Sequence, residues 1–514
     1  MLAKTYGAAV YGVNASIITI EVSAGDQGKG FFIVGLPDNA VKESEQRVET
    51  ALKELDYFFP RRKVVVNLAP ADIRKEGSSY DLPIALSILH ASGQSDFPLL
   101  EKYLIMGELA LDGVLRPIKG VLPISIEARK QGFKGFVLPK ENALEASIVN
   151  NLDIIGVDNL QEAIDFFRGK KAIEPLVTDT RELFASHQNE YDADFANVQG
   201  QENIKRALEI AAAGGHNLIM IGPPGAGKTM LAKRLPTILP PLSLHEALET
   251  TKIHSVAGKL GSKGSLISTR PYRSPHHTIS DAALVGGGSI PQPGEISLAH
   301  NGVLFLDELP EFKRSALEVM RQPLEDRKVS ISRAKWAVEF PSNFMLIASM
   351  NPCPCGYYNH PEKECVCGPG VVQRYLNKIS GPLLDRIDLH VEVTPVNFDQ
   401  LASNRKAEIS QTIRERVIAA RAVQTRRFAD NKEIHSNAMM PSQMVKEICE
   451  ISEAGKTLLK RAMEKLQLSA RAYDRILKVA RTIADLSDSA DIKTEHLAEA
   501  IQYRTLDREN WAGE

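Results

Sequence analysis

The stretch Gly222-Pro-Pro-Gly-Ala-Gly-Lys228-Thr229 decides the fold class of the region around it. It follows an apolar run, Leu218-Ile-Met-Ile221, and precedes a stretch with a helical pattern, Met230-Leu-Ala-Lys-Arg-Leu235. A strand, a glycine-rich loop and a helix in this order are the context that a Walker A motif requires. We therefore predict an α/β fold built around a nucleotide-binding loop.

The residues of this loop suit the phosphates of a nucleotide. The glycines let successive backbone N–H groups turn inward, and the helix N-terminus adds partial positive charge. Lys228 is expected to reach the β- and γ-phosphates, and Thr229 to hold Mg²⁺. ATP and Mg²⁺ are the predicted cofactors. The residues expected to surround ATP are Gly222, Pro223, Pro224, Gly225, Ala226, Gly227, Lys228, Thr229 and Met230.

Length and composition are those of an ordinary globular protein with about three domains. The chain has 514 residues, of which 43% are apolar and 25% charged. Lys and Arg number 62 against 64 Asp and Glu, a formal net charge of -2, so a nucleic-acid partner must be met by a local basic patch. Neither a signal peptide nor an apolar run of membrane-spanning length is visible. We expect a cytoplasmic protein with no membrane partner, whose five cysteines are thiols or metal ligands.

Shifts in pattern divide the chain into four predicted segments. β-rich pieces at 16–22 and 63–67 alternate with helical patterns at 39–55 and 82–91. A polar connection follows, then the α/β block with the glycine loop, and finally a region of helical patterns at 398–428, 441–465, 469–486 and 494–503. The predicted boundaries are an α/β domain at 1–172, a linker at 173–194, a core at 195–396 and a helical domain at 397–514.

Two further strand ends complete the expected nucleotide site. Val303-Leu-Phe-Leu-Asp307-Glu308 reads as a buried strand ending in two acids, the Walker B pattern. Asp307 is expected to support Mg²⁺, and Glu308 to activate the attacking water. Asn351 follows another apolar strand at 344–348 and fits sensor 1, a polar residue between the two Walker strands. The alternative for Asn351 is a turn asparagine.

Two arginines downstream match positions that serve catalysis in ring ATPases. Arg386 lies in Gly381-Pro-Leu-Leu-Asp-Arg386-Ile-Asp388, which matches the segment carrying the arginine finger supplied to a neighbouring subunit. Arg471, in Ser469-Ala-Arg471-Ala-Tyr473, looks like sensor 2, which contacts the γ-phosphate. A surface ion pair is the alternative for each.

The order of these motifs is that of an AAA+ ATPase. Three more stretches resemble the magnesium-chelatase-related branch, and within it the ComM (YifB) competence-protein family: Arg270-Pro-Tyr-Arg-Ser-Pro-His-His277, Gly294-Glu-Ile-Ser-Leu-Ala-His-Asn-Gly302 and Asn351-Pro-Cys-Pro-Cys-Gly356. The resemblance implies a homo-hexameric ring that encloses DNA. It implies ATP-driven branch migration or unwinding of single-stranded, double-stranded or branched DNA during natural transformation, with recombination proteins as possible partners.

Two other classes of function compete with a DNA motor. One is a metal-insertion motor like the magnesium chelatase ATPase subunit, and the other an ATP-dependent protease. The pattern Asp485-Leu-Ser487-Asp-Ser489 matches the metal-adhesion motif of the chelatase partner subunit. That motif must end an apolar strand, whereas this one follows a helical pattern, so we predict a helix-ending loop.

Two segments are candidates for DNA contact. The stretch at 329–340 reads as a β-hairpin with a basic, aromatic tip formed by Arg333, Lys335 and Trp336, and it resembles the pre-sensor-1 hairpin of MCM-type rings. The basic residues suit phosphates and the tryptophan suits a base. Lys259 and Lys263 lie in a glycine-rich segment that suits a pore loop. The alternatives are a solvated turn with a packed tryptophan and an ordinary exposed hairpin.

Four cysteines gather shortly after Asn351: Cys353, Cys355, Cys365 and Cys367. Thiols this close in a reducing compartment favour zinc over disulfides. His360 is an alternative fourth ligand, and a Cys-, Pro- and Gly-rich turn is the alternative without metal. Cys449 stands alone in a helical pattern and is expected in the core.

The N-terminal block resembles the proteolytic domain of Lon, an α/β fold of the ribosomal S5 type. Lys75-Glu-Gly-Ser-Ser79-Tyr aligns with the nucleophile turn, and Gly113-Val-Leu-Arg-Pro-Ile-Lys-Gly-Val-Leu122 with the turn bearing the catalytic lysine. Ser79 stands at the nucleophile position, but Leu122 occupies the lysine position and Lys119 is offset by three residues. Because a Ser–Lys pair needs the amine as base, we predict a non-proteolytic scaffold or DNA-binding collar.

Overall fold

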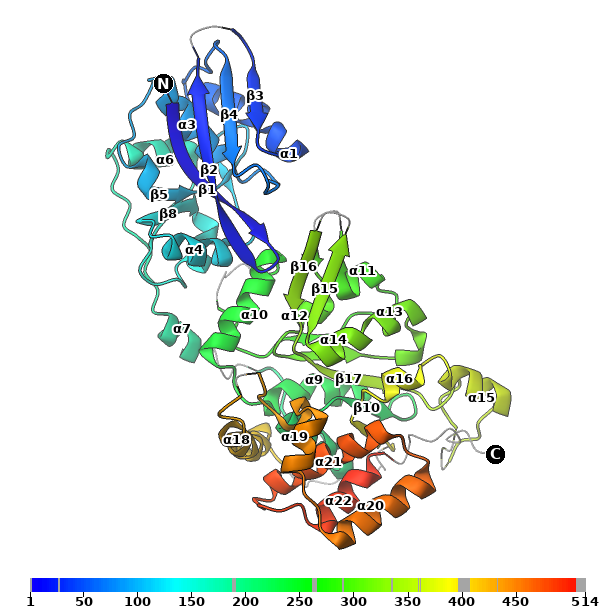
Figure 1. Ribbon diagram of the computed structural model, residues 1–514. Coiled ribbons are helices and arrows are strands. Elements are labelled where there is room, and N and C mark those ends of the chain that lie inside the picture. Colours follow the sequence, from blue (N-terminus) through cyan, green and yellow to red (C-terminus); the bar gives the residue numbers. More distant parts are fainter. Residues whose placement is uncertain are drawn as a thin grey trace.

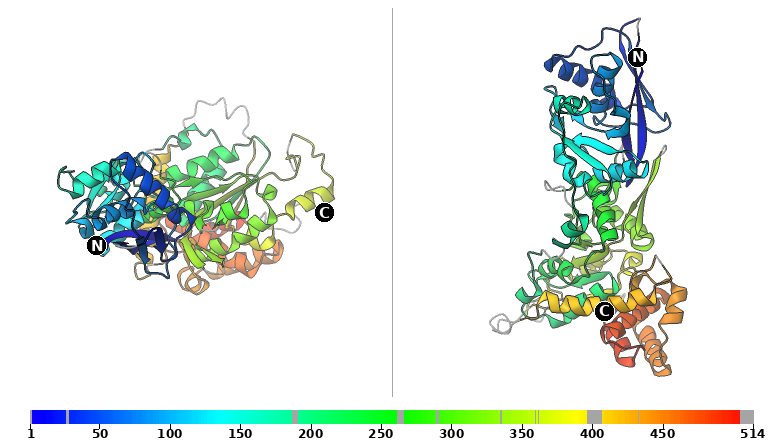
Figure 2. Two further views of the ribbon diagram at one scale, coloured as in Figure 1. Left: turned by 90° about the horizontal axis from the view of Figure 1, so that it is seen from above. Right: turned by 90° about the vertical axis from the view of Figure 1, so that its left-hand side faces the viewer.

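The computed structural model describes residues 2–25, 28–186, 191–260, 266–288, 291–333, 336–358, 360, 362–395, 407–431 and 433–504. Three units follow one another along an elongated molecule: an N-terminal α/β unit, a central α/β unit and a helical C-terminal unit (Figures 1 and 2). The predicted α/β fold class is therefore confirmed. Within the described ranges, every helix is too short or too polar to cross a membrane.

The N-terminal unit is built on a seven-stranded mixed sheet with the order β3-β4-β2-β1-β5-β8-β9. Its strands are β1 (Leu2–Tyr11), β2 (Asn14–Ala24), β3 (Phe31–Val34), β4 (Val64–Ala69), β5 (Tyr103–Ile105), β8 (Gly135–Pro139) and β9 (Asp153–Val157). Its helices are α1 (Asn39–Lys42), α2 (Ser44–Glu54), α3 (Asp81–Ala91), α4 (Val121–Lys130), α5 (Ala143–Ala146) and α6 (Leu160–Phe167), and β6 (Glu108–Leu109) pairs with β7 (Leu115–Arg116). Helix α3 is buried almost all round because apolar residues cover most of its surface.

The predicted linker at 173–194 is not a plain polar connection. It contains helix α7 (Thr180–Ser186). The backbone N–H of Leu176 donates to the Ile154 carbonyl at 2.9 Å, and the Thr180 hydroxyl donates to the Ile148 carbonyl at 2.9 Å. These contacts hold the first half of the segment against the N-terminal unit. Composition indicated the polar character but gave no sign of this docking.

The central unit carries a five-stranded parallel sheet with the order β11-β14-β17-β10-β18. The strands are β11 (Tyr272–Arg273), β14 (Val303–Leu306), β17 (Met345–Met350), β10 (Leu218–Ile221) and β18 (Leu389–Glu392). The middle strands are buried along their whole length, as expected for a parallel sheet covered on both faces. Alternate residues enter separate cores: Leu218 and Met220 lie in one, Ile219 and Ile221 in the other. Strand β17 lies between the two Walker strands, as predicted.

Helices and a hairpin surround this sheet (Figure 1). The helices are α8 (Glu202–Gly214), α9 (Lys228–Ile238), α10 (Leu244–Val256), α11 (Asp281–Val285), α12 (Glu295–Leu298), α13 (Arg314–Val319), α14 (Arg321–Asp326), α15 (Pro369–Leu376) and α16 (Gly381–Leu384). Short strands β12 (Gly286–Gly287) and β13 (Gln292–Pro293) pair with each other. The predicted hairpin is present as β15 (Lys328–Arg333) and β16 (Trp336–Pro341), and it points toward the N-terminal unit.

The C-terminal unit consists of α18 (Ser410–Arg427), α19 (Ser442–Ile448), α20 (Glu453–Leu466), α21 (Ala470–Leu486) and α22 (Thr494–Gln502). The single helix predicted at 441–465 is wrong, because the Ser452 side chain accepts from the Gly455 N–H and starts a second helix there. Of the helix predicted at 398–428, residues 398–406 lie outside the described part, and the described helix begins at Ser410. Helix α21 ends at Leu486, and residues 487–489 of the D-x-S-x-S pattern follow it in a loop, as predicted.

An apolar cluster joins the N-terminal and central units. Leu122, Ile148 and Val149 of the first pack with Leu242, Ala247 and Leu266 of the second. Polar contacts flank this cluster: the Gly120 N–H donates to the Ser255 carbonyl at 3.1 Å, and the Tyr11 hydroxyl donates to the Ala337 carbonyl of β16 at 2.8 Å. The two units are thus packed together rather than merely tethered.

Candidate nucleotide-binding site and metal centre

Lys228 ties together the loop that follows β10 and the end of β17. It is the first residue of α9, and its side chain is buried. Its Nζ donates to the Gly222 carbonyl at 2.7 Å, the Pro223 carbonyl at 2.9 Å and Asn351 Oδ1 at 3.1 Å. Burial lowers the pKa of Lys228, against the opposing influence of Asp307 and Glu308. The predicted lysine and sensor asparagine are therefore brought into direct contact.

The loop needs glycine at specific points. Gly227, which caps α9, has φ +85°, a left-handed conformation that glycine adopts without steric cost. A Cβ on Gly222 would lie 2.3 Å from the Val393 carbonyl oxygen, because the loop runs against the end of β18. The backbone thus leaves α9 with its first N–H groups available at the carboxyl edge of the sheet, where anions bind.

Thr229 and Asp307 meet at the same edge. The Thr229 hydroxyl donates to Asp307 Oδ2 at 2.7 Å, and the Ser349 hydroxyl donates to Asp307 Oδ1. A hydroxyl and a carboxylate side by side are the oxygen ligands that Mg²⁺ takes together with nucleotide phosphates and water. These two residues therefore fit the predicted magnesium position.

Glu308 adopts a backbone conformation that is unusual for its residue type. Its φ and ψ are +53° and +51°, in the left-handed region, a kind of strain that concentrates at functional sites. Its side chain is about half exposed, and Oε2 lies 3.5 Å from Nδ1 of His277. The sequence singled out His277 only as part of a family motif. Nothing in the sequence indicated that the loop after β11 brings His277 beside the Walker B strand β14, with which β11 pairs.

The two predicted catalytic arginines lie at the opposite edge of the sheet. Arg386 precedes β18, and the Asp388 N–H after it donates to the carbonyl of Asn217, just before β10. The Arg386 side chain is nearly buried: Nη2 lies 2.5 Å from Glu325 Oε1, and Nη1 donates to the Pro382 carbonyl at 2.6 Å. Its ion pair with Glu325 is internal, a partner that the sequence did not indicate.

Arg471 differs from Arg386 in its exposure. It stands in the first turn of α21, its side chain is 65% exposed, and Nη1 lies 3.8 Å from Asp385 Oδ2. An exposed ion pair of this length contributes little stability. Arg471 is therefore available for another contact, while its role remains a prediction.

The four cysteines converge on one point. Their Sγ atoms all lie within 4.8 Å of one another. Tetrahedral zinc with bonds of about 2.3 Å places its sulfurs about 3.8 Å apart. The Sγ of Cys353 lies 3.3 Å from that of Cys355 and 3.7 Å from that of Cys365, and the Cys355–Cys365 separation is 3.6 Å. The cluster therefore fits a zinc ion.

Hydrogen bonds among the cysteines divide their acidity. Burial acts to raise the pKa of Cys355, but hydrogen bonds from the Tyr357 backbone N–H and from Cys353 lower it, whereas the hydrogen bonds with Cys355 and Cys353 raise the pKa values of Cys365 and Cys367. Thiolate is the form that binds metal.

Cys449 is buried in the helical unit, as predicted.

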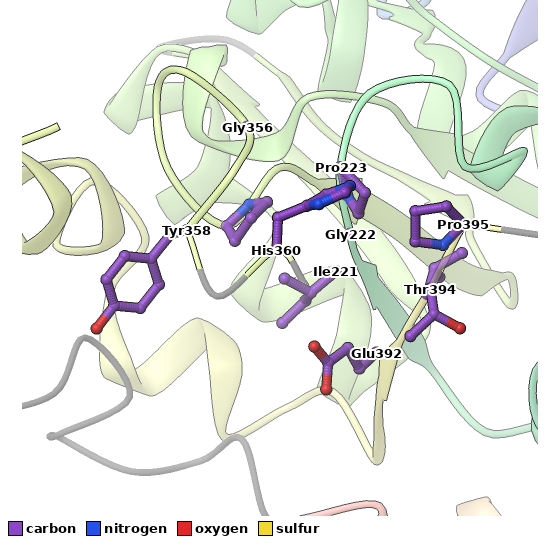
Figure 3. Close-up of a pocket in the computed structure, with 11 residues that line it drawn as sticks. Ile221, Gly222, Pro223, Gly356, Tyr358, His360, Glu392, Thr394 and Pro395 are labelled. Carbon is purple, nitrogen blue, oxygen red and sulfur yellow. The ribbon is translucent and has the colours of Figure 1, made fainter. Parts of the chain in front are cut away.

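The cysteine-rich loop lies directly against the nucleotide loop (Figure 3). Gly356 has φ +85°, and a Cβ there would lie 2.5 Å from Pro224 Cδ. His360 shares a small pocket with Gly222 and Pro223, and its Nδ1 accepts from the N–H groups of Glu362 and Lys363. His360 therefore faces the nucleotide loop, and the described group that could hold a metal consists of the four cysteines without it.

The candidate DNA contacts are only partly within the described residues. Arg333 and Trp336 are the last backbone pair of the β15–β16 ladder, so the hairpin itself is present. Lys335 and Lys263 lie outside the described residues. Lys259 is half exposed, with Nζ 3.6 Å from Glu295 Oε1. Their contacts with DNA remain predictions.

The Lon-like positions carry no Ser–Lys pair. Leu122, at the lysine position, is fully buried in the cluster between the N-terminal and central units. Lys119 lies with its methylenes against Gly258 of the central unit. A leucine of the packing surface thus occupies the position of the catalytic lysine, and the non-proteolytic role of the unit stays a prediction.

Comparison with known proteins agrees with this architecture. Residues 194–401 match the family described as magnesium chelatase, subunit ChlI, residues 18–142 the subunit ChlI family of Mg-chelatase, and residues 407–504 the ChlI C-terminal family. The chain is 44% identical to competence protein ComM of Haemophilus influenzae over 510 residues, 99% of this chain and 98% of that protein. It is 45% identical to YifB of Salmonella typhimurium over 511 residues, 99% and 98% of the two chains.

The N-terminal unit has a second relationship. Lon protease 2 of Bacillus subtilis is 33% identical over 155 residues, 28% of this chain and 27% of that protein. The predicted Lon-like domain is therefore confirmed, together with an AAA+ core and a helical C-terminal domain.

Proposed function

This chain belongs to the ComM (YifB) family of magnesium-chelatase-like AAA+ proteins, and we propose that it is an ATP-hydrolysing hexameric motor that moves along DNA. We propose branch migration or unwinding as its activity and homologous recombination during natural transformation as its setting. The relative named competence protein ComM supports that setting. The limits 1–172, 173–194, 195–396 and 397–514 remain our proposed domain boundaries.

One observation supports ATP hydrolysis most strongly. Two hydrogen bonds meet at the carboxyl edge of a parallel sheet, beside the N-terminus of α9. One joins Lys228 to Asn351, and the other joins the neighbouring Thr229 to Asp307. In our proposal Lys228 neutralises the β- and γ-phosphates, and Asn351 and Glu308 place the attacking water. Mg²⁺ held near Thr229 and Asp307 would offset the charge that develops between these phosphates.

The placement of the arginines supports a ring. Arg386 lies at the amino edge of the sheet, while the nucleotide loop follows the carboxyl end of β10, so Arg386 is separated from its own chain's site by the length of the strands. It is therefore suited to a nucleotide held by another copy. We propose that Arg386 acts as the finger across such a subunit contact, and that Arg471 acts as sensor 2.

For the DNA path we propose the β15–β16 hairpin, with Arg333, Lys335 and Trp336, and the segment bearing Lys259 and Lys263. The hairpin is braced by the N-terminal unit through the hydrogen bond from Tyr11 to Ala337. This contact supports a scaffold role for the Lon-like unit. We also propose that Cys353, Cys355, Cys365 and Cys367 hold one structural zinc ion.

The second candidate is a metal-insertion motor, favoured by the magnesium chelatase families that match all three regions. The two candidates differ in what stimulates hydrolysis. The decisive measurement is the ATPase rate with single-stranded DNA, with forked DNA and without DNA, together with displacement of a labelled strand. Stimulation by DNA supports the DNA motor. An ATPase rate that DNA does not change, with no strand displacement, contradicts it.

Variants of two residues test the nucleotide site within the same assay. Lys228→Ala is expected to lose tight ATP binding, because it removes the phosphate-neutralising charge. Glu308→Gln is expected to bind ATP and scarcely hydrolyse it, because only the water-activating carboxylate is lost. Hydrolysis by Glu308→Gln at the wild-type rate would refute the assignment.

A further inference from the structure

A second hollow, of about 570 Å³, lies at the edge of the central sheet opposite the nucleotide loop. Its floor is formed where strands begin: Gly215 precedes β10, Gly302 precedes β14, and Met345 opens β17. Helices α10 and α18 supply walls. Nothing in the proposed ATP, zinc or DNA chemistry uses this cavity.

Basic residues outnumber acidic residues in the lining of this cavity. Arg270, Arg327 and Arg421 all border the cavity, as do His245, His300 and His435, against only two acids, Glu246 and Glu249. Arg270 lies 3.4 Å from Glu246, and His300 lies 3.7 Å from Glu249, so both acids already have basic partners. Within the described part of the chain, neither Arg327 nor Arg421 has a carboxylate at ion-pair distance.

Arg421 and Arg327 are held only by neutral oxygen atoms. Arg421 donates to the His435 and Ala212 carbonyls, each at 3.1 Å, and its buried Nε has no hydrogen-bond partner among the described residues. Arg327 donates to the Asn343 side-chain oxygen. Both side chains are partly buried where they border the cavity. A guanidinium remains charged in proteins, and leaving it partly buried without a counter-charge is costly.

Burial and neighbouring positive charges make the charged forms of Arg421 and Arg327 less favourable. Burial, together with repulsion from Arg270, lowers the pKa of Arg421 to about 9. Burial also lowers the pKa of Arg327 to about 10; the attraction of Asp388 opposes this change, and repulsion from Arg475 adds to it. An anion in the cavity would relieve both effects at once.

His300 adds a directed donor. Its Nδ1 accepts the Asn343 backbone N–H at 3.0 Å, so in the neutral ring the proton sits on Nε2. That Nε2 is buried and, among the described residues, has no hydrogen-bond partner. His300 Nε2 faces Glu249 Oε2 at 3.7 Å, too far for a hydrogen bond, and it borders the same cavity as two guanidinium groups that, in the described part of the chain, have no carboxylate at ion-pair distance.

We propose that this cavity binds a small phosphate-bearing anion, with Arg327 and Arg421 supplying the charge and His300 a further hydrogen bond. Phosphate suits the site better than a carboxylate, because its several oxygens and multiple charges match two forked guanidinium groups. The phosphate comes either free, as inorganic pyrophosphate or a similar ion, or as part of a nucleotide. This site is distinct from the one around Lys228, at the other edge of the sheet.

The test uses full-length Lys228→Ala protein, in which the nucleotide loop is disabled. Binding of radiolabelled pyrophosphate and of ATP is measured by equilibrium dialysis, and thermal unfolding with each ligand is followed in parallel. We expect about one pyrophosphate per chain and a raised melting temperature. Adding Arg327→Gln or Arg421→Gln should weaken binding at least tenfold, because glutamine keeps hydrogen-bonding capacity and loses the charge.

Arg426→Gln is the matched control, because Arg426 lies on the same helix α18 but is exposed and does not line the cavity. Competition by ATP identifies a nucleotide as the source of the phosphate, and binding of pyrophosphate alone identifies the free ion. Pyrophosphate binding that is absent from the Lys228→Ala protein, or equal in Arg327→Gln and Arg426→Gln, would overturn the proposal. Arg327→Gln decides the question if Arg421→Gln fails to fold, since Arg421 also holds the end of α8.

Discussion

Replacing Gly356 with alanine tests whether the cysteine-rich loop supports the nucleotide loop. Gly356 has φ +85°, and an added Cβ would lie 2.5 Å from Cδ and 3.1 Å from Cγ of Pro224. Carbon atoms do not approach so closely, and the proline ring cannot rotate away. One of the two loops must therefore move.

The size of the effect follows from two contributions. Holding alanine in the left-handed region costs about 1–2 kcal/mol. Relieving the overlap costs a further amount of about 1–3 kcal/mol, typical of overpacking. If roughly 1.4–2 kcal/mol of the total falls on the state that binds ATP, affinity drops about 10- to 30-fold.

The assay is a fluorescence titration with a labelled ATP analogue, combined with zinc analysis of each protein. Gly368→Ala is the matched control, because Gly368 belongs to the same loop and a Cβ there meets nothing within 4 Å. We expect Gly368→Ala to bind like the wild type. If Gly356→Ala retains its zinc and binds ATP as tightly as Gly368→Ala, the contact with Pro224 has no functional weight and the reasoning fails.

Three further predictions concern other parts of the molecule. We expect elemental analysis to find one zinc per wild-type chain and none in Cys353→Ser, whereas Cys449→Ser, which removes an isolated buried thiol, should retain the zinc. Asp388→Asn is expected to lower the free energy of unfolding by about 3–5 kcal/mol at pH 7, because it leaves Arg475 without its buried partner. Replacing Arg333 and Lys335 together with alanine should weaken DNA binding at every sequence and flatten its salt dependence, because fewer counterions are released, while basal ATPase activity survives.

Each of these has a contradicting result. Zinc-free wild-type protein with four titratable thiols would end the metal assignment, and unchanged DNA affinity and salt slope would make the hairpin structural. For Asp388, burial acts to raise the pKa, but Arg475 and His216 bring it well below its usual range. Its contribution is therefore complete above about pH 4 and is lost as pH falls further. A stability gap between wild type and Asp388→Asn that is small at pH 7, or that widens below pH 4, contradicts this account.

The sequence predicts correctly those features of the fold that residues close together in the chain determine. The strand, loop and helix around Lys228 and the acids after β14 are short-range features, and β17 could be placed between the Walker strands from the motif order. The cysteines could be grouped because they lie close in sequence. Patterns also identified most helices, since burial of one face is written in their periodicity.

Long-range contacts account for what the sequence did not reveal. Arg386 pairs with Glu325, and Arg270, Arg327 and Arg421 border one cavity although they are far apart in the chain. Only packing of the helices against the sheet brings such residues together. The break at Ser452 was missed for a different reason, because an apolar pattern continues across a serine that can equally cap a new helix.

The two edges of the central sheet also define how a ring would operate. Asn217 ties the amino edge together: its side chain accepts the Leu346 N–H of β17 and donates to the Arg386 carbonyl, which precedes β18. On the proposed hexamer, the amino edge of one chain faces the nucleotide of the next. Arg386 must then exchange Glu325 for the γ-phosphate. Because the ion pair of the nearly buried Arg386 with the half-exposed Glu325, at 2.5 Å, opposes that exchange, assembly of the ring and binding of ATP would together favour release of the finger.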